Sequence, residues 1–166
     1  MMNQKLFMKA RSHDPDAFTE LVESELKGMY RTAYAILLND ADAADAIQDT
    51  ILTLWEKISD LKKAEYFRTW STRILMNKCF DIRRRRSTEI TTEEMQETPY
   101  EDTSDLEWRD ALSFLDDKYR VPIELFYGQG YRTSEIAEML DIPESTVRTR
   151  LMRGREKLKQ YYNDKE

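Results

Sequence analysis

The chain has 166 residues, enough for one medium domain or two small ones, and 35% of them are charged. Glycine and proline number only four each, a composition that favours an all-α protein. The longest purely apolar run, Ala33 to Leu38, is far too short to cross a bilayer. The N-terminus lacks the apolar segment of a signal peptide, so we expect a cytoplasmic protein with no membrane insertion of its own.

The net charge of −6 is unevenly distributed along the chain. Residues 1–86 carry 15 basic and 13 acidic side chains, residues 108–166 carry 11 of each, and residues 87–107 carry eight acidic side chains and no basic ones. The acidic stretch has few large apolar residues and contains Pro99, which is typical of a flexible linker. We therefore predict two small helical domains, residues 1–86 and 106–166, joined by a flexible acidic linker over residues 87–105.

The N-terminal domain begins with a helix-start signal at Asp14 and Pro15. Aspartate caps a helix through its side-chain oxygen, and proline is tolerated at the first helical position. A second helix is expected from about Leu26 to Leu38, ending near Asn39.

A third helix is predicted from Asp42 to Ile58, with two distinct faces. The apolar, inward stripe consists of Ala43, Ile47, Ile51, Leu54 and Ile58, with Trp55 beside it. The outward face is acidic and consists of Asp45, Asp49, Leu52 and Glu56, flanked by Gln48. An acidic face with a lone leucine in its middle indicates a surface for docking another protein. An ordinary solvated face fits the same periodicity equally well.

A fourth helix is predicted over roughly Glu65 to Arg84. One side carries Phe67, Trp70, Ile74 and Asp81, and the other carries Thr69, Thr72, Arg73, Met76, Phe80 and Arg83. The second group mixes cations with apolar and hydroxyl side chains, which suits a single nucleic-acid strand whose bases stack and whose phosphates need neutralising. A helix packed on both sides would show the same pattern.

The segment from Tyr131 to Lys159 predicts a helix-turn-helix. Ser134 or Thr133 can cap its first helix, and the turn at 141–143 contains a proline that cannot continue it. Glu144 restarts the chain as a second helix. The first helix has a short apolar face of Ile136, Ala137 and Leu140.

A helical wheel of the second helix separates a buried stripe from a basic face. The inward positions are Val147, Leu151, Gly154 and Leu158. The outward positions are Ser145, Thr149, Met152, Arg153 and Glu156, flanked by Arg148 and Arg155 on one side and by Arg150 and Lys157 on the other. This layout favours a helix in the major groove, with central side chains on base edges and flanking cations on phosphates. The alternative is a solvated basic helix without a ligand.

Little in the sequence suggests catalysis. His13 is the only histidine and Cys79 the only cysteine, so no zinc-ligand cluster is available, and no glycine-rich phosphate loop occurs. We expect no enzymatic activity, no cofactor and no metal.

Both halves resemble the extracytoplasmic-function sigma factors, the smallest class of the bacterial primary-sigma family. DADAADAIQDTILTLW at 40–55 and FRTWSTRILMNKCFDIRR at 67–84 resemble region 2 of that family. The stretch from Leu115 to Leu158 resembles region 4 almost throughout. The resemblance covers roughly residues 15–86 and 106–160, in the family's order.

The resemblance implies a specificity subunit of RNA polymerase and assigns three sets of residues. The set implied to bind core polymerase, on the β′ clamp, is Asp45, Gln48, Asp49 and Leu52. The set implied to recognise and melt the minus-ten element is Phe67, Trp70, Arg73, Asn77 and Arg83, with a base-flipping loop at 59–66. The set implied to read the minus-thirty-five element is Ser145, Thr146, Arg148, Thr149, Met152, Arg153 and Arg155. The implied partners are the β′ and β subunits of the core enzyme, promoter DNA and an anti-sigma factor.

The sequence departs from the family pattern at four positions. Ala44 stands where the family usually has glutamate, so we expect somewhat weaker docking. Asp141 replaces the usual glycine of the turn, and aspartate tolerates a left-handed backbone better than most residues do. Ser145 and Gly154 are mild changes.

Two other functional classes are compatible with part of the sequence. A polymerase-independent helix-turn-helix regulator would bind a palindrome as a dimer, and nothing in the sequence resembles a dimerisation zipper. A pure interaction module would leave the arginine face unexplained. A further hypothesis places the acidic linker in the positively charged RNA path of the polymerase.

Overall fold

The computed structural model describes residues 3–87 and 103–165, and within these ranges every regular element is a helix or helical turn. The all-α class is therefore confirmed. None of the helices in these ranges is long and apolar enough to span a membrane. The elements in chain order are α1 (Gln4–Arg11), α2 (Pro15–Leu37), α3 (Asp40–Lys57), the 3₁₀ turns η1 (Ile58–Asp60) and η2 (Ala64–Tyr66), α4 (Phe67–Arg86), α5 (Thr103–Phe114), α6 (Asp117–Ile123), the π-helical turn η3 (Glu124–Gly128), α7 (Thr133–Leu140) and α8 (Glu144–Asp164).

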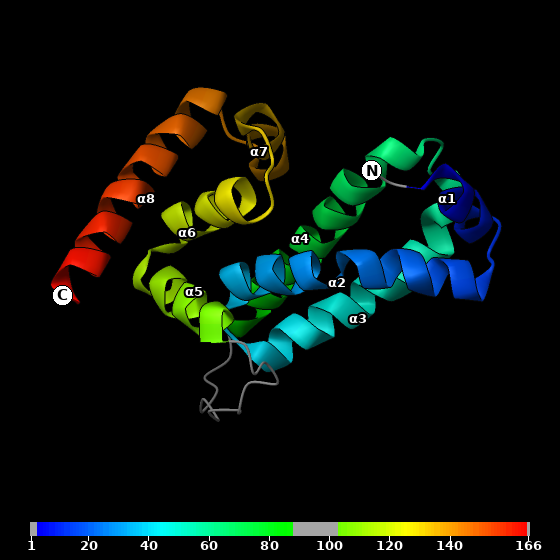
Figure 1. Ribbon diagram of the computed structural model, residues 1–166, viewed down its shortest axis with the longest axis horizontal. Helices are drawn as coiled ribbons and strands as arrows, with labels where there is room; N and C mark the ends of the chain where they lie inside the picture. Colours follow the sequence, from blue (N-terminus) through cyan, green and yellow to red (C-terminus); the bar gives the residue numbers. More distant parts are fainter. Residues whose placement is uncertain (1–2, 88–102, 166) are drawn as a thin grey trace.

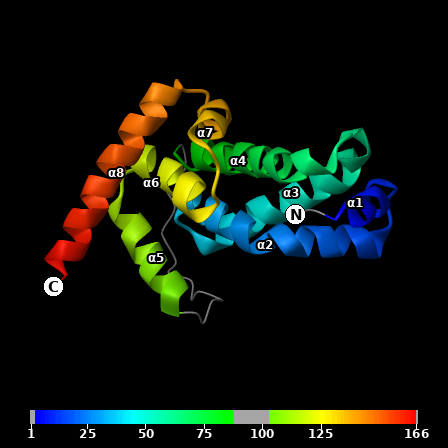
Figure 2. The ribbon, with the colours of Figure 1, turned by 45° about the horizontal axis from the view of Figure 1, so that its top comes forward.

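The N-terminal half is a bundle in which α2, α3 and α4 pack against one another and α1 closes one end (Figure 1). Its core beneath α1 is built from the apolar stripes of these helices. The fully buried members include Phe7, Leu21, Leu54, Ile58 and Phe67. Figure 2 shows the same helices from a second direction, with α1 at the end farthest from α8.

The C-terminal half packs α8 along α6 and across the end of α7 (Figure 1). Gly154 makes the close approach of α8 to α6 possible, because a Cβ at this position would lie 2.8 Å from Cγ1 of Ile123. The predicted inward place of Gly154 on α8 is thereby confirmed.

Helix α2 corrects the predicted division of residues 14–38 into two helices. Asp14 caps the helix as expected, since its Oδ1 accepts from the backbone N–H groups of Asp16 and Ala17 at 3.0 and 3.1 Å. The helix then continues without a break to Leu37 and ends at Leu38, whose φ is 51°. It remains continuous because its first turns pack in the core beneath α1, whereas its last turns pack in a second core.

Several predicted boundaries shift by a few residues. Helix α3 begins at Asp40 rather than Asp42, because Asn39 caps it and its Oδ1 accepts from the N–H of Asp42 at 2.9 Å. Helix α4 begins at Phe67, after η2, rather than at Glu65. Helix α1 was not predicted. Helix α5 begins at Thr103, so the last three residues of the predicted linker are helical. Ser87, the first residue of that linker, directly follows α4, and residues 88–102 lie outside the described residues.

The two halves share a buried core. This second core contains Ala33 and Ile36 of α2 and Met76 of α4 together with Val121 and Leu125 of the C-terminal half. Helix α2 contacts α5, α6 and η3 as well as its own neighbours. A flexible linker alone predicts two domains without fixed contact, and the structure instead packs the two halves together.

Candidate nucleic-acid interface

The helix-turn-helix predicted from the sequence is formed by α7 and α8. Asp141 ends α7 with φ of 54°, so the left-handed conformation expected at this turn is confirmed. The expected caps are wrong: α7 starts after Arg132, whose backbone N–H donates to the Glu135 carboxylate at 3.0 Å. The Thr133 hydroxyl donates instead to Glu144 at 2.7 Å and so links the two helices.

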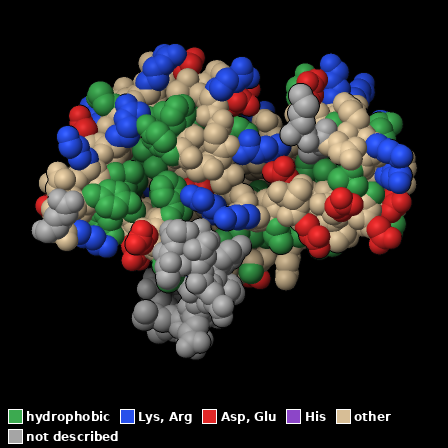
Figure 3. Space-filling view, in the orientation of Figure 1, with side chains coloured by type: hydrophobic (Ala, Val, Ile, Leu, Met, Phe, Trp, Pro, Cys, Tyr) green, Lys and Arg blue, Asp and Glu red, His purple; other side chains and the backbone are tan. Residues whose placement is uncertain are grey.

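The two predicted faces of α8 are present in the structure. Val147, Leu151 and Gly154 are buried, and Leu158 is half-buried. The outward residues are all exposed, namely Ser145, Thr149, Met152, Arg153 and Glu156. Thr146 is partly buried beside them. Figure 3 shows basic side chains spaced along the edge of the molecule where Figure 1 draws α8.

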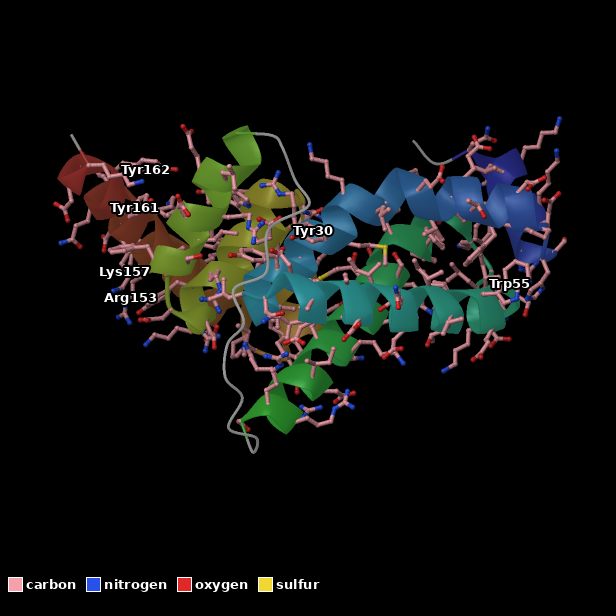
Figure 4. The ribbon with its side chains drawn as sticks, turned by 90° about the horizontal axis from the view of Figure 1, so that it is seen from below. Tyr30, Trp55, Arg153, Lys157, Tyr161 and Tyr162 are labelled. Carbon is pink, nitrogen blue, oxygen red and sulfur yellow. The ribbon has the colours of Figure 1, made fainter. Side chains whose placement is uncertain are left out.

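Two arginines of α8 have acceptors within the C-terminal half. Arg148 donates to the Glu144 carboxylate at 2.9 Å, and Arg155 donates to the Tyr127 hydroxyl at 2.9 Å. Both side chains remain exposed, so their charges stay available to an anion. Arg153 and Lys157 project from the same helix, at the opposite end of the molecule from Trp55 (Figure 4).

A groove beside α8 contains one cation, Lys118, that the sequence reasoning did not assign to DNA. Its lining residues are Lys118, Tyr119, Ser145, Thr146, Thr149, Arg150 and Arg153. Lys118 comes from the first turn of α6. The sequence signal that Lys118 belongs to a basic surface is weak, because Lys118 follows Asp116 and Asp117 and the local charge is therefore negative.

Helix α3 presents the predicted acidic face to solvent. Asp45, Gln48 and Asp49 are exposed, and Leu52 is 63% exposed, more than any other large apolar side chain in the described residues. The opposite stripe is buried at Ala43, Ile47 and Leu54, as predicted. The faces of α3 therefore lie as the periodicity indicated, and the acidic one has no cover within the described parts of the chain.

Helix α4 is packed on both sides, which was the alternative to a free nucleic-acid face. Arg73 and Asn77 are exposed, and Trp70 and Arg83 are half-buried. Phe67 is completely buried in the N-terminal core and packs against Trp70, with ring centroids 6.1 Å apart. In this structure Phe67 is therefore not available for direct contact with a strand.

The other side of α4 is covered by the C-terminal half. Thr72 and Met76 are 8% and 1% exposed. The Thr72 hydroxyl lies 2.7 Å from the hydroxyl of Tyr131, and Arg73 reaches the backbone carbonyl of Glu138 at 3.4 Å. A hollow of about 450 Å³ lies alongside, lined by Leu61, Tyr66, Thr69, Trp70 and Arg73 from the N-terminal half and by Arg132, Ser134, Glu135, Glu138 and Met139 from the C-terminal half.

A buried carboxylate that the sequence reasoning did not predict lies where the two halves meet. Glu124 is 1% exposed and lies 3.3 Å from Arg31 of α2. Its carboxylate also accepts from Trp108 and from the Gln129 amide, each at 2.8 Å. Burial raises the pKa of Glu124, and the nearby Arg31 and these hydrogen bonds offset only part of that effect.

The described residues contain no group of three or more His, Cys, Asp and Glu side chains that could hold a metal ion. Cys79 is buried, and burial raises the pKa of its thiol to about 12. A thiol in such an environment is unreactive and packs as a small apolar side chain.

Comparison with known families matches both halves of the chain. Residues 21–89 match Sigma-70 region 2, and residues 105–158 match Sigma-70 region 4. An ECF RNA polymerase sigma factor, SigL of Mycobacterium tuberculosis, is 31% identical over 136 residues, which cover 74% of this chain and 76% of that protein. The chain belongs to the ECF sigma factors. SigW of Bacillus subtilis, of the same family, is 29% identical over 99% of this chain and 98% of its own length.

Solved structures agree with this assignment. CnrH, solved in complex with the cytosolic domain of CnrY, is 26% identical, and the two chains cover 97% of each other with a TM-score of 0.71. The sigma factor RpoE of Bartonella quintana, solved in complex with the anti-sigma factor NepR, has the same fold, with a TM-score of 0.73 at 20% identity. That match covers 88% of this chain and 96% of RpoE.

Proposed function

We propose that this ECF sigma factor binds core RNA polymerase reversibly and directs it to promoters through two DNA-reading surfaces, one in each half. The observation that carries the proposal is the two-sided character of α8: a buried stripe seats the helix, and its opposite face is exposed and basic. A helix presented in this way fits the major groove of duplex DNA. In the proposal α8 reads the minus-thirty-five element.

Docking on the core enzyme is assigned to the acidic face of α3. The face is exposed at Asp45, Gln48, Asp49 and Leu52 and needs a basic partner with an apolar pocket for the leucine. The β′ clamp is the proposed partner for this face, and the β subunit is proposed to contact the protein elsewhere. The absence of glutamate at Ala44 leaves two acidic side chains at the centre of the contact.

The minus-ten element is assigned to α4 and to the loop before it. Trp70, Arg73, Asn77 and Arg83 supply stacking, hydrogen bonding and positive charge for a melted strand. Phe67 contributes by holding Trp70 in place from the core. The hollow beside Leu61 and Tyr66 is where we propose that an extruded base is held.

Partners and location follow from this role. Promoter DNA and polymerase are the proposed working partners, and we propose regulation by an anti-sigma factor, since the sigma factor RpoE was solved in complex with the anti-sigma factor NepR. The family consists of DNA-binding regulators, and we propose that this member has no catalytic activity of its own. Its place of action is proposed to be the cytoplasm.

A charge reversal on α3 tests the docking assignment. Association of the labelled protein with purified bacterial core polymerase is measured by fluorescence anisotropy for the wild type and for Asp45→Arg with Asp49→Arg. The double variant should lose at least about 100-fold in affinity, because two favourable charge contacts become repulsive. The matched control is Glu20→Arg with Glu23→Arg, which reverses two exposed acidic residues of α2 in the same half.

The control variant should bind core polymerase as the wild type does. Equal losses in both variants would show a general effect of net charge and remove the docking assignment. Tight, core-independent binding to a symmetric DNA site, with no affinity for polymerase, would favour the polymerase-independent regulator instead.

A further inference from the structure

The groove beside α8 adjoins a second groove that reaches the N-terminal half. The first has a volume of about 330 Å³ and the second of about 320 Å³. Lys118 and Arg150 line both, so the two form one surface, the inter-half groove, on helices that run from α8 past α6 to α4 (Figures 1 and 2). The second groove is lined by Phe80, Arg83, Asp117, Lys118, Val121, Pro122, Leu140 and Arg150.

Four cations from three helices line the inter-half groove. Arg153 lies at its α8 end, Arg83 lies at its α4 end, and Lys118 and Arg150 lie where the two grooves meet. Lys118 and Arg153 are exposed, and Arg83 and Arg150 are half-buried. The guanidinium of Arg83 lies 5.0 Å from the centroid of the Phe80 ring, which holds this side chain against the wall of the groove.

The negative charge in the inter-half groove is small. Among the described residues that line it, Asp117 is the only acidic one. Its carboxylate lies 3.3 Å from Arg83 and also accepts from Arg120, which is buried beneath the groove. Because Arg120 compensates Asp117 from below, the four cations that line the surface keep a positive excess.

This chemistry matches a sugar–phosphate backbone. Cations attract phosphates, and the hydroxyls of Ser145 and Thr149 at the α8 end can contact them as well. Arg150 lies on one flank of the outward face of α8, where a backbone strand runs when a helix occupies the major groove. Lys118 and Arg83 continue the line of positive charge from Arg150 on that same flank, away from α8 and toward α4.

We propose that the inter-half groove binds the backbone of the duplex whose bases α8 reads, so that Arg83 of the N-terminal half takes part in duplex binding by the free protein. This contact is independent of base sequence, because phosphates carry no sequence information. It is a second role for Arg83, beside the one assigned to it in the minus-ten element. The proposal rests on the proposed function in one respect, namely that α8 binds duplex DNA.

The salt dependence of duplex binding tests the proposal, because it counts phosphate contacts. Fluorescence anisotropy of the full-length protein is measured with the preferred upstream duplex and with a scrambled one, between about 50 and 200 mM salt. Lys118→Ala with Arg83→Ala should lower the slope of log K against log salt by about 1.8 and weaken both duplexes by the same factor. The matched control is Lys5→Ala with Lys9→Ala, two exposed cations of α1 at the far end of the molecule, and it should keep the wild-type slope.

Single variants show whether both halves contribute. Lys118→Ala and Arg83→Ala should each lower the slope by about 0.9, with unchanged circular dichroism. A lowered slope in Lys118→Ala together with a wild-type slope in Arg83→Ala would confine the contact to the C-terminal half and overturn the proposal. A slope lowered as much by the α1 control would show a general effect of net charge and would also overturn it.

A variant that gains affinity separates electrostatics from damage to the fold. Asp117→Asn removes the carboxylate from the groove and should tighten binding to both duplexes by about fivefold. Unchanged or weaker binding in this variant would contradict a phosphate strand beside Asp117.

The same titrations distinguish the groove from the proposed function. If the wild type bound neither duplex, the role assigned to α8 would be contradicted, and this proposal with it. If binding depended on Arg153 but its salt slope were the same in Arg83→Ala as in the wild type, the groove proposal alone would be overturned.

Discussion

Helices α4 and α8 carry similar chemistry and have opposite surroundings. Both combine arginines with hydroxyl and apolar side chains, and both are assigned to DNA. On α8 this face is open, with Arg153 and Met152 exposed. On α4 the corresponding face is covered, and Thr72 and Met76 are buried against the C-terminal half. The comparison indicates that the basic face of α8 is open in this structure, whereas one side of α4 is packed against the C-terminal half.

The difference also explains the two sequence patterns. Helix α8 has one apolar stripe, because only one of its sides is packed. Helix α4 has apolar residues around its circumference, because it packs on α2 and α3 and also faces η3 and α7. An apolar residue on the second side of α4 therefore serves an intramolecular contact.

The largest expected effect tests whether α8 is packed on one face only. Leu151→Ala, at 3% exposure, should cost about 2–5 kcal/mol of unfolding free energy, because it leaves a cavity beneath the helix. Its neighbour Met152, 46% exposed, should change stability by less than about 0.5 kcal/mol when replaced by alanine. Urea unfolding of both variants gives the comparison. Equal costs would mean that the outward face is also packed.

The next effect tests whether the open face of α8 binds DNA in the free protein. Arg153→Ala should weaken binding to the preferred upstream duplex by about 1–3 kcal/mol, the usual value of a base-reading arginine. Fluorescence anisotropy against this duplex and a scrambled one, at fixed salt, measures it. Lys159→Ala, exposed on the same helix, should weaken both duplexes alike. If Arg153→Ala also weakens both duplexes equally, this residue contacts phosphate and does not read bases.

A smaller effect tests whether the C-terminal half covers α4 in solution. The Thr72–Tyr131 hydrogen bond should contribute about 0.5–1.5 kcal/mol to stability. Tyr131→Phe removes the partner of the Thr72 hydroxyl, whereas in Thr72→Val the Tyr131 hydroxyl keeps only its 3.4 Å contact with the backbone carbonyl of Arg68. The double variant should therefore cost less than the sum of the two single changes. A double-mutant cycle in urea gives the coupling. A coupling of zero would place the two hydroxyls apart in solution.

The smallest effect is a pH dependence at the contact between the halves. Because burial raises the pKa of Glu124 above its ordinary 4.5, the folded protein keeps this proton to higher pH than the unfolded chain does. The stabilisation from Glu124 is thus complete below pH 4.5 and is lost as the pH rises through the raised pKa. Relative to Glu124→Gln, the wild type should lose stability over this interval in urea unfolding. If the unfolding free energies of the two proteins changed in parallel with pH, a raised pKa of Glu124 would be contradicted.

The sequence predicted the features that depend on neighbours along the chain. The cap at Asp14, the left-handed Asp141 and both faces of α3 and α8 follow from local rules of capping and periodicity, and the structure agrees. The resemblance to regions 2 and 4 rests on motifs that are likewise contiguous in the sequence.

The features that the sequence did not reveal depend on residues far apart. Nothing near Thr72 indicates that a tyrosine 59 positions later will cover it. The surroundings of Gly28 in α2 have a similar origin, because a Cβ at this position would lie 2.6 Å from Oε1 of Gln129 in the other half. In the sequence Glu124 is indistinguishable from a solvated acidic residue, because only the fold brings Arg31 and Trp108 to it.

The central claim is that this protein gives core RNA polymerase its promoter specificity, and run-off transcription tests it most directly. Purified core polymerase is supplied with a pool of the host's own promoter fragments, with and without this protein. We predict discrete new transcripts that appear only with the wild type and disappear with Asp45→Arg plus Asp49→Arg. Absence of new transcripts at saturating protein, or the same transcripts from the double variant, would contradict the account.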